Sequence, residues 1–180
     1  MKNFVHLPCD NQAAISDELY NYLHDYTDTV TGNMERHVCY TDAQPLIEHC
    51  PLLRTYLHSL ELSDPKIVHV NRCNTDQRLH IDEHPLICMM FPVRNCVGTT
   101  RTYYYELENM VAVQTLSKFG VPYYELKYDS IKELDSYELS SPVMMNPNVP
   151  HHLKTIQPVL PDYRIAVRFR FYNDPQHFLL

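Results

Sequence analysis

The sequence predicts a mainly β protein with a few helices near its N-terminal end. Apolar residues recur at helical spacing only before Asp64 and Pro65. After that point the chain carries roughly eight short runs rich in β-branched and aromatic residues, which are typical of strands. Strands in that number, with helices gathered at one end, predict a jelly roll backed by helices.

The first helix is expected from residue 10 to about residue 26. Ile15, Leu19 and Leu23 recur there at every fourth position, which places them on one face of a helix. Asp10 precedes this pattern. It is the expected N-cap, because an aspartate oxygen can accept a hydrogen bond from a free N–H of the first turn.

A second helical region is expected from residue 41 or 42 to about residue 60. Pro45 fits its first turn, where a missing N–H costs nothing, whereas Pro51 is expected to break or restart the helix. The buried side of this region is expected to consist of four leucines, Leu46, Leu53, Leu57 and Leu60.

The expected strands lie at 66–73, 78–82, 86–93, 101–107, 123–128, 142–145, 149–156 and 163–172. The last of them has the clearest alternation, in which Ile165, Val167, Phe169 and Phe171 are separated by Arg164, Ala166, Arg168, Arg170 and Tyr172. This strand therefore has one apolar face and one arginine-rich face.

The whole chain, 1–180, is expected to form one domain. Its 180 residues and mass of 21.3 kDa suit a single hydrophobic core. No Gly/Ser linker or internal repeat separates the mostly helical part, 1–65, from the strand-rich part, 66–173. With 44% hydrophobic residues, disorder is excluded as the general state.

Composition also limits the surroundings and the partners. The longest apolar stretch, 85–93, is about half of the roughly 20 residues that cross a bilayer, and the N-terminus shows no secretory signal, so a cytoplasmic protein is expected. A net charge of −7 disfavours a nucleic-acid partner. The six cysteines include no Cys-x-x-Cys pair and are expected to be reduced and mostly buried.

Candidate metal ligands occur in two places. His80 and Asp82 are two residues apart in an expected strand, so both side chains point to one face. Farther along, His151 and His152 follow a Pro/Asn turn, and either could complete a set of two histidines and one carboxylate, although the preceding Val-Pro favours His151. Such a set leaves adjacent positions open, as Fe(II) needs to hold a co-substrate and O2 together.

Arg164 opens the last expected strand, thirteen residues after His151. An arginine can pair with a carboxylate through two hydrogen bonds, so beside a metal it would anchor the far end of a dicarboxylate. Arg168 and Arg170 share a face with Arg164. They either line the substrate side of the barrel or stand in solvent.

In this order, these residues resemble the Fe(II)/2-oxoglutarate-dependent dioxygenases. The closest likeness is to small stand-alone members with the motifs IP-x-x-NC-x-G-T and VPH-R-V, matched here by FPVRNCVGT at 91–99 and VPHHL at 149–153. The likeness covers 67–172. It implies a double-stranded β-helix, with His80, Asp82 and His151 as iron ligands and Arg164 binding the distal carboxylate of 2-oxoglutarate. The implied activity is hydroxylation of a small molecule or a protein side chain by O2.

Two positions depart from that family pattern. His152 stands where an arginine is usual, and Ala166 replaces the serine of an Arg-x-Ser motif, which removes a hydroxyl contact to the co-substrate. One of three adjacent tyrosines is expected to supply that hydroxyl; Tyr104 is our candidate, and it would face away from Tyr103 and Tyr105.

Several alternatives remain open. His84 shares strand parity with His80 and competes as a ligand, although Pro85 beside it suggests a place at the pocket mouth. His69 is expected to be a core histidine. The whole protein could instead be a cupin-like barrel that binds a metal or carboxylate without oxidation, or an interaction module that uses its arginine-rich face.

Overall fold

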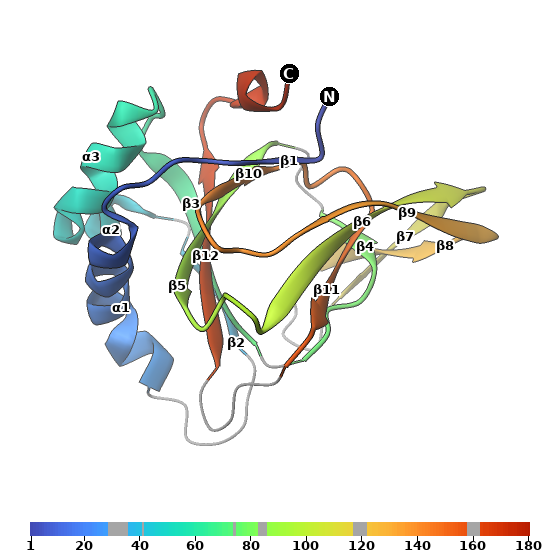
Figure 1. Cartoon of the computed structure of the whole chain (residues 1–180), viewed down its shortest axis with the longest axis horizontal. Coiled ribbons are helices and arrows are strands. Elements are labelled where there is room, and N and C mark those ends of the chain that lie inside the picture. The colour runs from blue at the N-terminus through green and yellow to red at the C-terminus, as the bar shows by residue number, and fades with distance from the viewer. Residues whose placement is uncertain (29–35, 41, 74, 83–85, 117–121, 158–162) are drawn as a thin grey trace.

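The computed structural model describes residues 1–28, 36–40, 42–73, 75–82, 86–116, 122–157 and 163–180, without the side chains at 24–28, 36–40 and 122–123. Its strands form two antiparallel sheets (Figure 1). Sheet A has the order β1 (Phe4–His6), β10 (Val143–Met145), β5 (Cys88–Arg94), β12 (Arg164–Phe171), β3 (Pro65–Cys73) and β2 (Arg36–Tyr40). Sheet B has the order β7 (Val111–Leu116), β8 (Pro122–Lys127), β4 (His80–Ile81), β11 (His151–Thr155), β6 (Thr100–Glu108) and β9 (Ser130–Tyr137).

Three helices cover the face of sheet A that is turned away from sheet B (Figure 1). They are α1 (Gln12–Asp28), α2 (Gln44–His49) and α3 (Pro51–Ser59), and a short 3-10 helix, η1 (Gln176–Leu179), ends the chain. The expectation of a mainly β protein with helices from its N-terminal part is therefore confirmed.

Both helical regions were predicted, but one detail was wrong. Pro45 lies in the first turn of α2 and Pro51 starts α3, as expected from the geometry of proline. Asp10, however, is not the N-cap of α1. The carbonyl of Asn11 accepts the first intrahelical hydrogen bond, from the N–H of Ile15 at 3.0 Å, so Asn11 holds that position.

All eight expected strands exist, with ends shifted by a few residues, and four further strands were missed. The missed strands are β1, β2, β7 and β9, which are the edges of the two sheets. Edge strands need not show the alternation on which the predictions relied. For example, every residue of β7 except Thr115 is exposed.

The two faces of β12 belong to two different hydrophobic cores. Its apolar face, from Ile165 to Phe171, packs with residues of the helices in the core between sheet A and the helical layer. Its other face points toward sheet B, where Ala166 belongs to a second core that also contains Tyr104 and Tyr137. The arginine-rich face of β12 therefore lies between the sheets, in what we call the interior.

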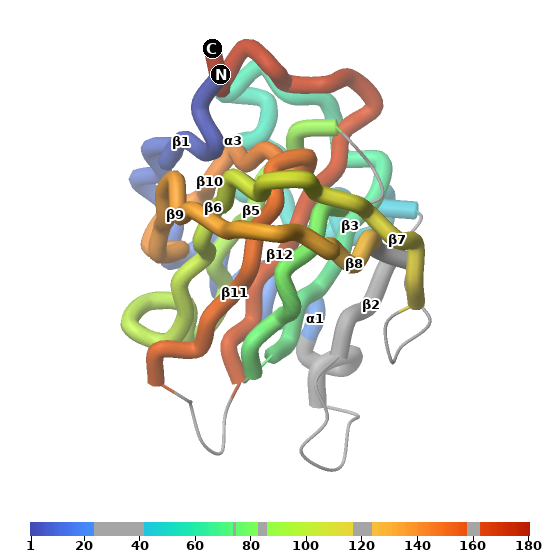
Figure 2. The backbone as a smooth tube through the Cα atoms, turned by 90° about the vertical axis from the view of Figure 1, so that its right-hand side faces the viewer, coloured from blue at the N-terminus to red at the C-terminus, as the bar shows by residue number. Residues whose placement is uncertain are grey.

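The two chain ends meet at one end of the molecule, as Figure 2 shows. The N–H of Lys2 donates to the carbonyl of Leu179 at 2.8 Å, and β1 then joins sheet A beside β10. Phe4 of β1 reaches the interior, where its ring stacks on that of Tyr104 at 6.0 Å between centroids. The N-terminal strand thus closes one side of the interior.

The five cysteines whose side chains are described are all free thiols, and four of them are buried. Among the described residues, no helix has both the length and the apolar character required to cross a membrane.

Candidate metal centre

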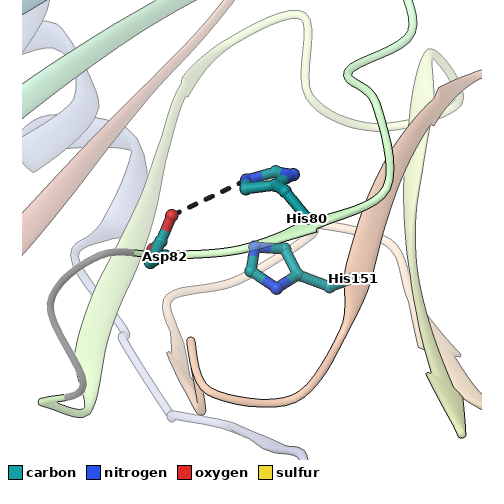
Figure 3. A group of neighbouring side chains, drawn as sticks. All are labelled: His80, Asp82 and His151. Atoms are coloured by element: carbon teal, nitrogen blue, oxygen red, sulfur yellow. Dashed lines mark ion pairs between the residues drawn. The ribbon is translucent and has the colours of Figure 1, made fainter. Parts of the chain in front are cut away.

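The structure brings His80, Asp82 and His151 together in the interior (Figure 3). His80 belongs to β4 and pairs directly with His151, the first residue of the neighbouring strand β11. Asp82 follows β4, and its N–H donates to the carbonyl of Pro147 at 3.1 Å, in the turn that leads to His151. Strand pairing and this turn contact fix the three residues relative to one another.

The ligand atoms of these residues all lie within 4.8 Å of one another. The shortest described separation joins His80 Nε2 and Asp82 Oδ1, at 3.6 Å, and the two imidazole centroids are 4.5 Å apart. With metal bonds of about 2.1 Å, adjacent ligand atoms stand about 3 Å apart. The group is therefore slightly wider than a loaded site and needs only small side-chain rotations to close on an ion.

Both histidines present the same ring nitrogen to the centre. His80 Nδ1 lies 2.6 Å from the carbonyl oxygen of Arg78, and His151 Nδ1 lies 2.9 Å from that of Val149. A carbonyl oxygen only accepts, so each Nδ1 carries the hydrogen, and the lone pair of a neutral ring is on Nε2. Metal-binding histidines are commonly oriented by a hydrogen bond of this kind.

The Asp82 side chain is only 8% exposed and contacts two arginines. Arg168 Nη1 donates a hydrogen bond to Asp82 Oδ2, and Arg170 Nη2 lies 3.6 Å from the same oxygen. Burial alone would raise the pKa of this carboxyl. The positive charge of Arg168 outweighs burial and holds the pKa of Asp82 well below its usual range.

His151 is also buried, with 6% exposure. Burial, with a smaller contribution from the neighbouring His80, lowers the pKa of His151 to about 4. At neutral pH the centre therefore offers an ionised carboxylate at Asp82 and a neutral imidazole at His151. A metal ion requires these protonation states from its ligands.

Arg164 and Tyr104 also lie in the interior. Arg164 is 3% exposed, and its Nη1 lies 3.8 Å from Cys73 Sγ. Tyr104 is fully buried opposite His151 in the pairing of β6 with β11, with 5.9 Å between the ring centroids. Arg164 Nε and the Tyr104 hydroxyl have no hydrogen-bond partner within the described part of the chain. Both groups are thus available to an anionic ligand.

Burial, followed by the neighbouring Tyr137, raises the pKa of Tyr104 well above its usual value. Its hydroxyl is therefore protonated and can donate. Tyr103 and Tyr105 lie on the opposite face of β6, with 6.5 Å between their ring centroids. Of the three tyrosines, Tyr104 alone faces the interior.

Three other histidines were considered from the sequence. His152 faces away from the centre. It lies in a groove of about 690 Å³ on the outer side of sheet B, with its ring stacked near Tyr105 and Nε2 at 4.0 Å from Asp76. His69 is half-buried on β3, opposite Arg168 of β12. His84 lies outside the described residues.

Sequence reasoning left the roles of Arg168 and Arg170 open. Both side chains lie in the interior, where 15% of Arg168 and 7% of Arg170 remain exposed. Both residues are an even number of positions from Arg164 in the same strand, and this spacing predicted that all three arginines share one face. Their contact with Asp82 could not be read from the sequence, because it joins β12 of sheet A to the residue that follows β4 of sheet B.

The donor set combines two imidazole nitrogens and one carboxylate oxygen. That combination suits iron and other divalent transition metals and leaves coordination positions open. Among the described residues, only these three form such a group. No known family model matches the chain, and a comparison with curated proteins found no match either.

Proposed function

We propose that this chain is a non-haem Fe(II)/2-oxoglutarate-dependent dioxygenase that hydroxylates a small molecule or a protein side chain. The observation that carries the proposal is the orientation of His80 and His151. Each ring is held through Nδ1, so that both Nε2 atoms are presented beside the Asp82 carboxylate in a buried interior.

The strand order supports a double-stranded β-helix. The core strands in chain order are β3, β4, β5, β6, β9, β10, β11 and β12, with the β7–β8 hairpin inserted between the fourth and fifth. Sheet A then reads sixth, third, eighth, first, and sheet B reads second, seventh, fourth, fifth. Two Greek keys wrapped into a jelly roll produce this alternation of early and late strands.

In this proposal His80, Asp82 and His151 hold Fe(II). When bound, the metal and 2-oxoglutarate supply the oxidative chemistry, in which O2 is consumed, 2-oxoglutarate becomes succinate and CO2, and the primary substrate gains a hydroxyl. The protein binds and orients the reactants and limits water in the interior.

Arg164 is assigned to the distal carboxylate of 2-oxoglutarate. It lies on the same face of β12 as Arg168, four residues away, which is about 13 Å along a strand. Burial of its guanidinium would strengthen a two-point pairing with a carboxylate. Ala166 between them supplies no hydroxyl, so Tyr104, which has a buried and unused O–H, is assigned the missing hydrogen bond.

The test is succinate formation by purified protein supplied with Fe(II), 2-oxoglutarate and O2. Wild-type protein is expected to form succinate slowly even without its primary substrate, whereas Asp82→Ala should lose this activity because a ligand is missing. His152→Ala is the matched control. It removes the adjacent histidine, which faces the outer side of sheet B, and should leave turnover intact.

Full activity in Asp82→Ala would contradict the assignment of the metal ligands. Confirmed metal binding without any succinate would instead favour a barrel that binds metal or carboxylate without oxidation.

A further inference from the structure

The two oxygens of Asp82 face different partners. Oδ1 is turned toward His80 Nε2, at 3.6 Å. Oδ2 accepts the hydrogen bond from Arg168 Nη1 and lies 3.6 Å from Arg170 Nη2. The carboxylate therefore has one oxygen directed at the imidazoles and one directed at the guanidinium groups.

A carboxylate beside a metal can bind through one oxygen or through both. Rotation about the last bond of an aspartate side chain is soft, so the side chain itself does not choose between these modes. A charge-assisted hydrogen bond to one oxygen does impose a choice, because that oxygen would have to leave its donor to reach the metal.

The position of Arg168 favours a persistent hydrogen bond to Asp82 Oδ2. It comes from β12, which lies between β5 and β3 in the middle of sheet A, so its backbone is fixed by pairing on both sides. Its side chain is 15% exposed and crosses the interior to the end of β4 in sheet B. Water therefore competes weakly for Oδ2.

We infer that Arg168 is a positioning residue that keeps Asp82 Oδ2 off the metal, so that Asp82 supplies one ligand atom and three of six coordination positions stay open. This inference rests on the proposed function, because it takes His80, Asp82 and His151 as the ligands. Three open positions are what a two-point co-substrate and O2 require together.

The loss of Arg168 should have two linked effects. Oδ2 becomes free to bind the metal as a second ligand atom, and a positive charge that repels the cation is removed. Both effects strengthen binding of the metal alone. The first also removes one open position. Arg168→Met is therefore expected to bind metal more tightly while holding fewer exchangeable waters.

Mn2+ is the probe, since it needs no exclusion of O2. Calorimetry gives its affinity, and line broadening of its EPR signal in 17O-enriched water counts the bound waters. We expect three waters in wild-type protein, and two waters with at least tenfold tighter binding in Arg168→Met. Arg72→Met is the matched control, because Arg72 lies on the adjacent strand opposite Ile165 and packs on Tyr163. It should match wild type.

Two waters in wild-type protein would overturn the inference, whether or not the variant folds. It would also be overturned by a variant whose binding is unchanged or weaker, or by one that binds more tightly but keeps three waters. If wild-type protein binds no Mn2+, the metal centre itself is wrong, and the proposed function fails with it.

Discussion

His80 and His151 are oriented by the same kind of local hydrogen bond. In each case Nδ1 donates to the backbone carbonyl two residues earlier in the chain, on Arg78 and Val149 respectively. Because such a contact depends only on local strand geometry, it sets the ring before any metal arrives. The interior therefore contains a partly preorganised nitrogen pair beside a carboxylate whose charge Arg168 compensates.

Removal of the Tyr104 hydroxyl should stabilise the ligand-free protein and weaken its binding of 2-oxoglutarate. A buried donor without a partner costs about 1–3 kcal/mol, so Tyr104→Phe should raise the free energy of unfolding of the ligand-free protein by about 1 kcal/mol. The same change should weaken 2-oxoglutarate binding, because the assigned hydrogen bond is lost. Urea unfolding with a chelator present and titration with 2-oxoglutarate measure the two effects.

Tyr103→Phe serves as the control for that prediction, since Tyr103 is half-buried on the other face of β6. It should alter neither quantity. A loss of stability in Tyr104→Phe greater than about 1 kcal/mol would mean that the hydroxyl has a partner in the folded protein.

Because of Tyr137, the stability of the protein should fall at alkaline pH. Burial raises the pKa of Tyr137 to about 12, whereas an unfolded tyrosine ionises near pH 10. Between these values the unfolded chain releases the proton and the folded protein retains it, so stability falls as the pH rises. Full titration of this one group amounts to about 3 kcal/mol.

The measurement compares wild-type protein with Tyr137→Phe in urea unfolding from pH 9 to pH 12. The variant lacks this group, so the stability difference between the two proteins should shrink or reverse toward high pH. A difference that stays constant over that range would show that Tyr137 ionises equally in both states.

At the level of elements, α1 and α3 are joined by a contact that sequence patterns do not reveal. Glu18 of α1 accepts hydrogen bonds from the N–H groups of Leu52 and Leu53, in the first turn of α3, at 3.2 and 3.0 Å. A carboxylate at a helix N-terminus satisfies free donors and interacts favourably with the helix dipole. Here the acceptor comes from a different helix.

Glu18→Ala should therefore lower the free energy of unfolding by about 1 kcal/mol, the usual value of a lost cap. Asp17→Ala is the control, because Asp17 is exposed and its pair with Arg94 spans 3.7 Å at the surface. Thermal or chemical unfolding of both variants measures the difference. Equal stabilities would assign no capping role to Glu18.

Burial explains which strands could be predicted from the sequence and which could not. The central strands bury one or both faces, so their composition shows the burial, as in β5, where only Arg94 is exposed. The edge strands β7 and β9 are mostly exposed and carry no such pattern. Asp10 was a plausible cap by residue type, yet the first intrahelical hydrogen bond of α1 is accepted by Asn11, so the cap lies one residue later.

At the level of the whole molecule, the sequence predicted which face of β12 carries the arginines but not where that face points. Its direction follows from the helical layer, which covers the apolar face and leaves the arginines between the sheets. The grouping of His80 with Asp82 followed from strand parity. The proximity of His151 depends on the pairing of β4 with β11, which no local pattern determines.

The charges of the interior are the most distinctive property of the molecule as a whole. The chain carries a net charge of −7, yet three arginines of β12, Arg164, Arg168 and Arg170, are buried or nearly so on one face of that strand, and two of them, Arg168 and Arg170, contact the carboxylate of Asp82. Such an interior suits an anionic ligand together with a cation held by Asp82 and the imidazoles. This arrangement links the metal centre to the proposed co-substrate.

The most direct test is an anaerobic titration of the purified protein with Fe(II) and 2-oxoglutarate. The titration is monitored by visible absorption spectroscopy. Our account predicts a weak metal-to-ligand charge-transfer band that is absent with Fe(II) alone, disappears with a chelator, and is lost in His80→Ala and Arg164→Ala but kept in His152→Ala. Metal binding at this centre with no such band at saturating 2-oxoglutarate would contradict the dioxygenase assignment.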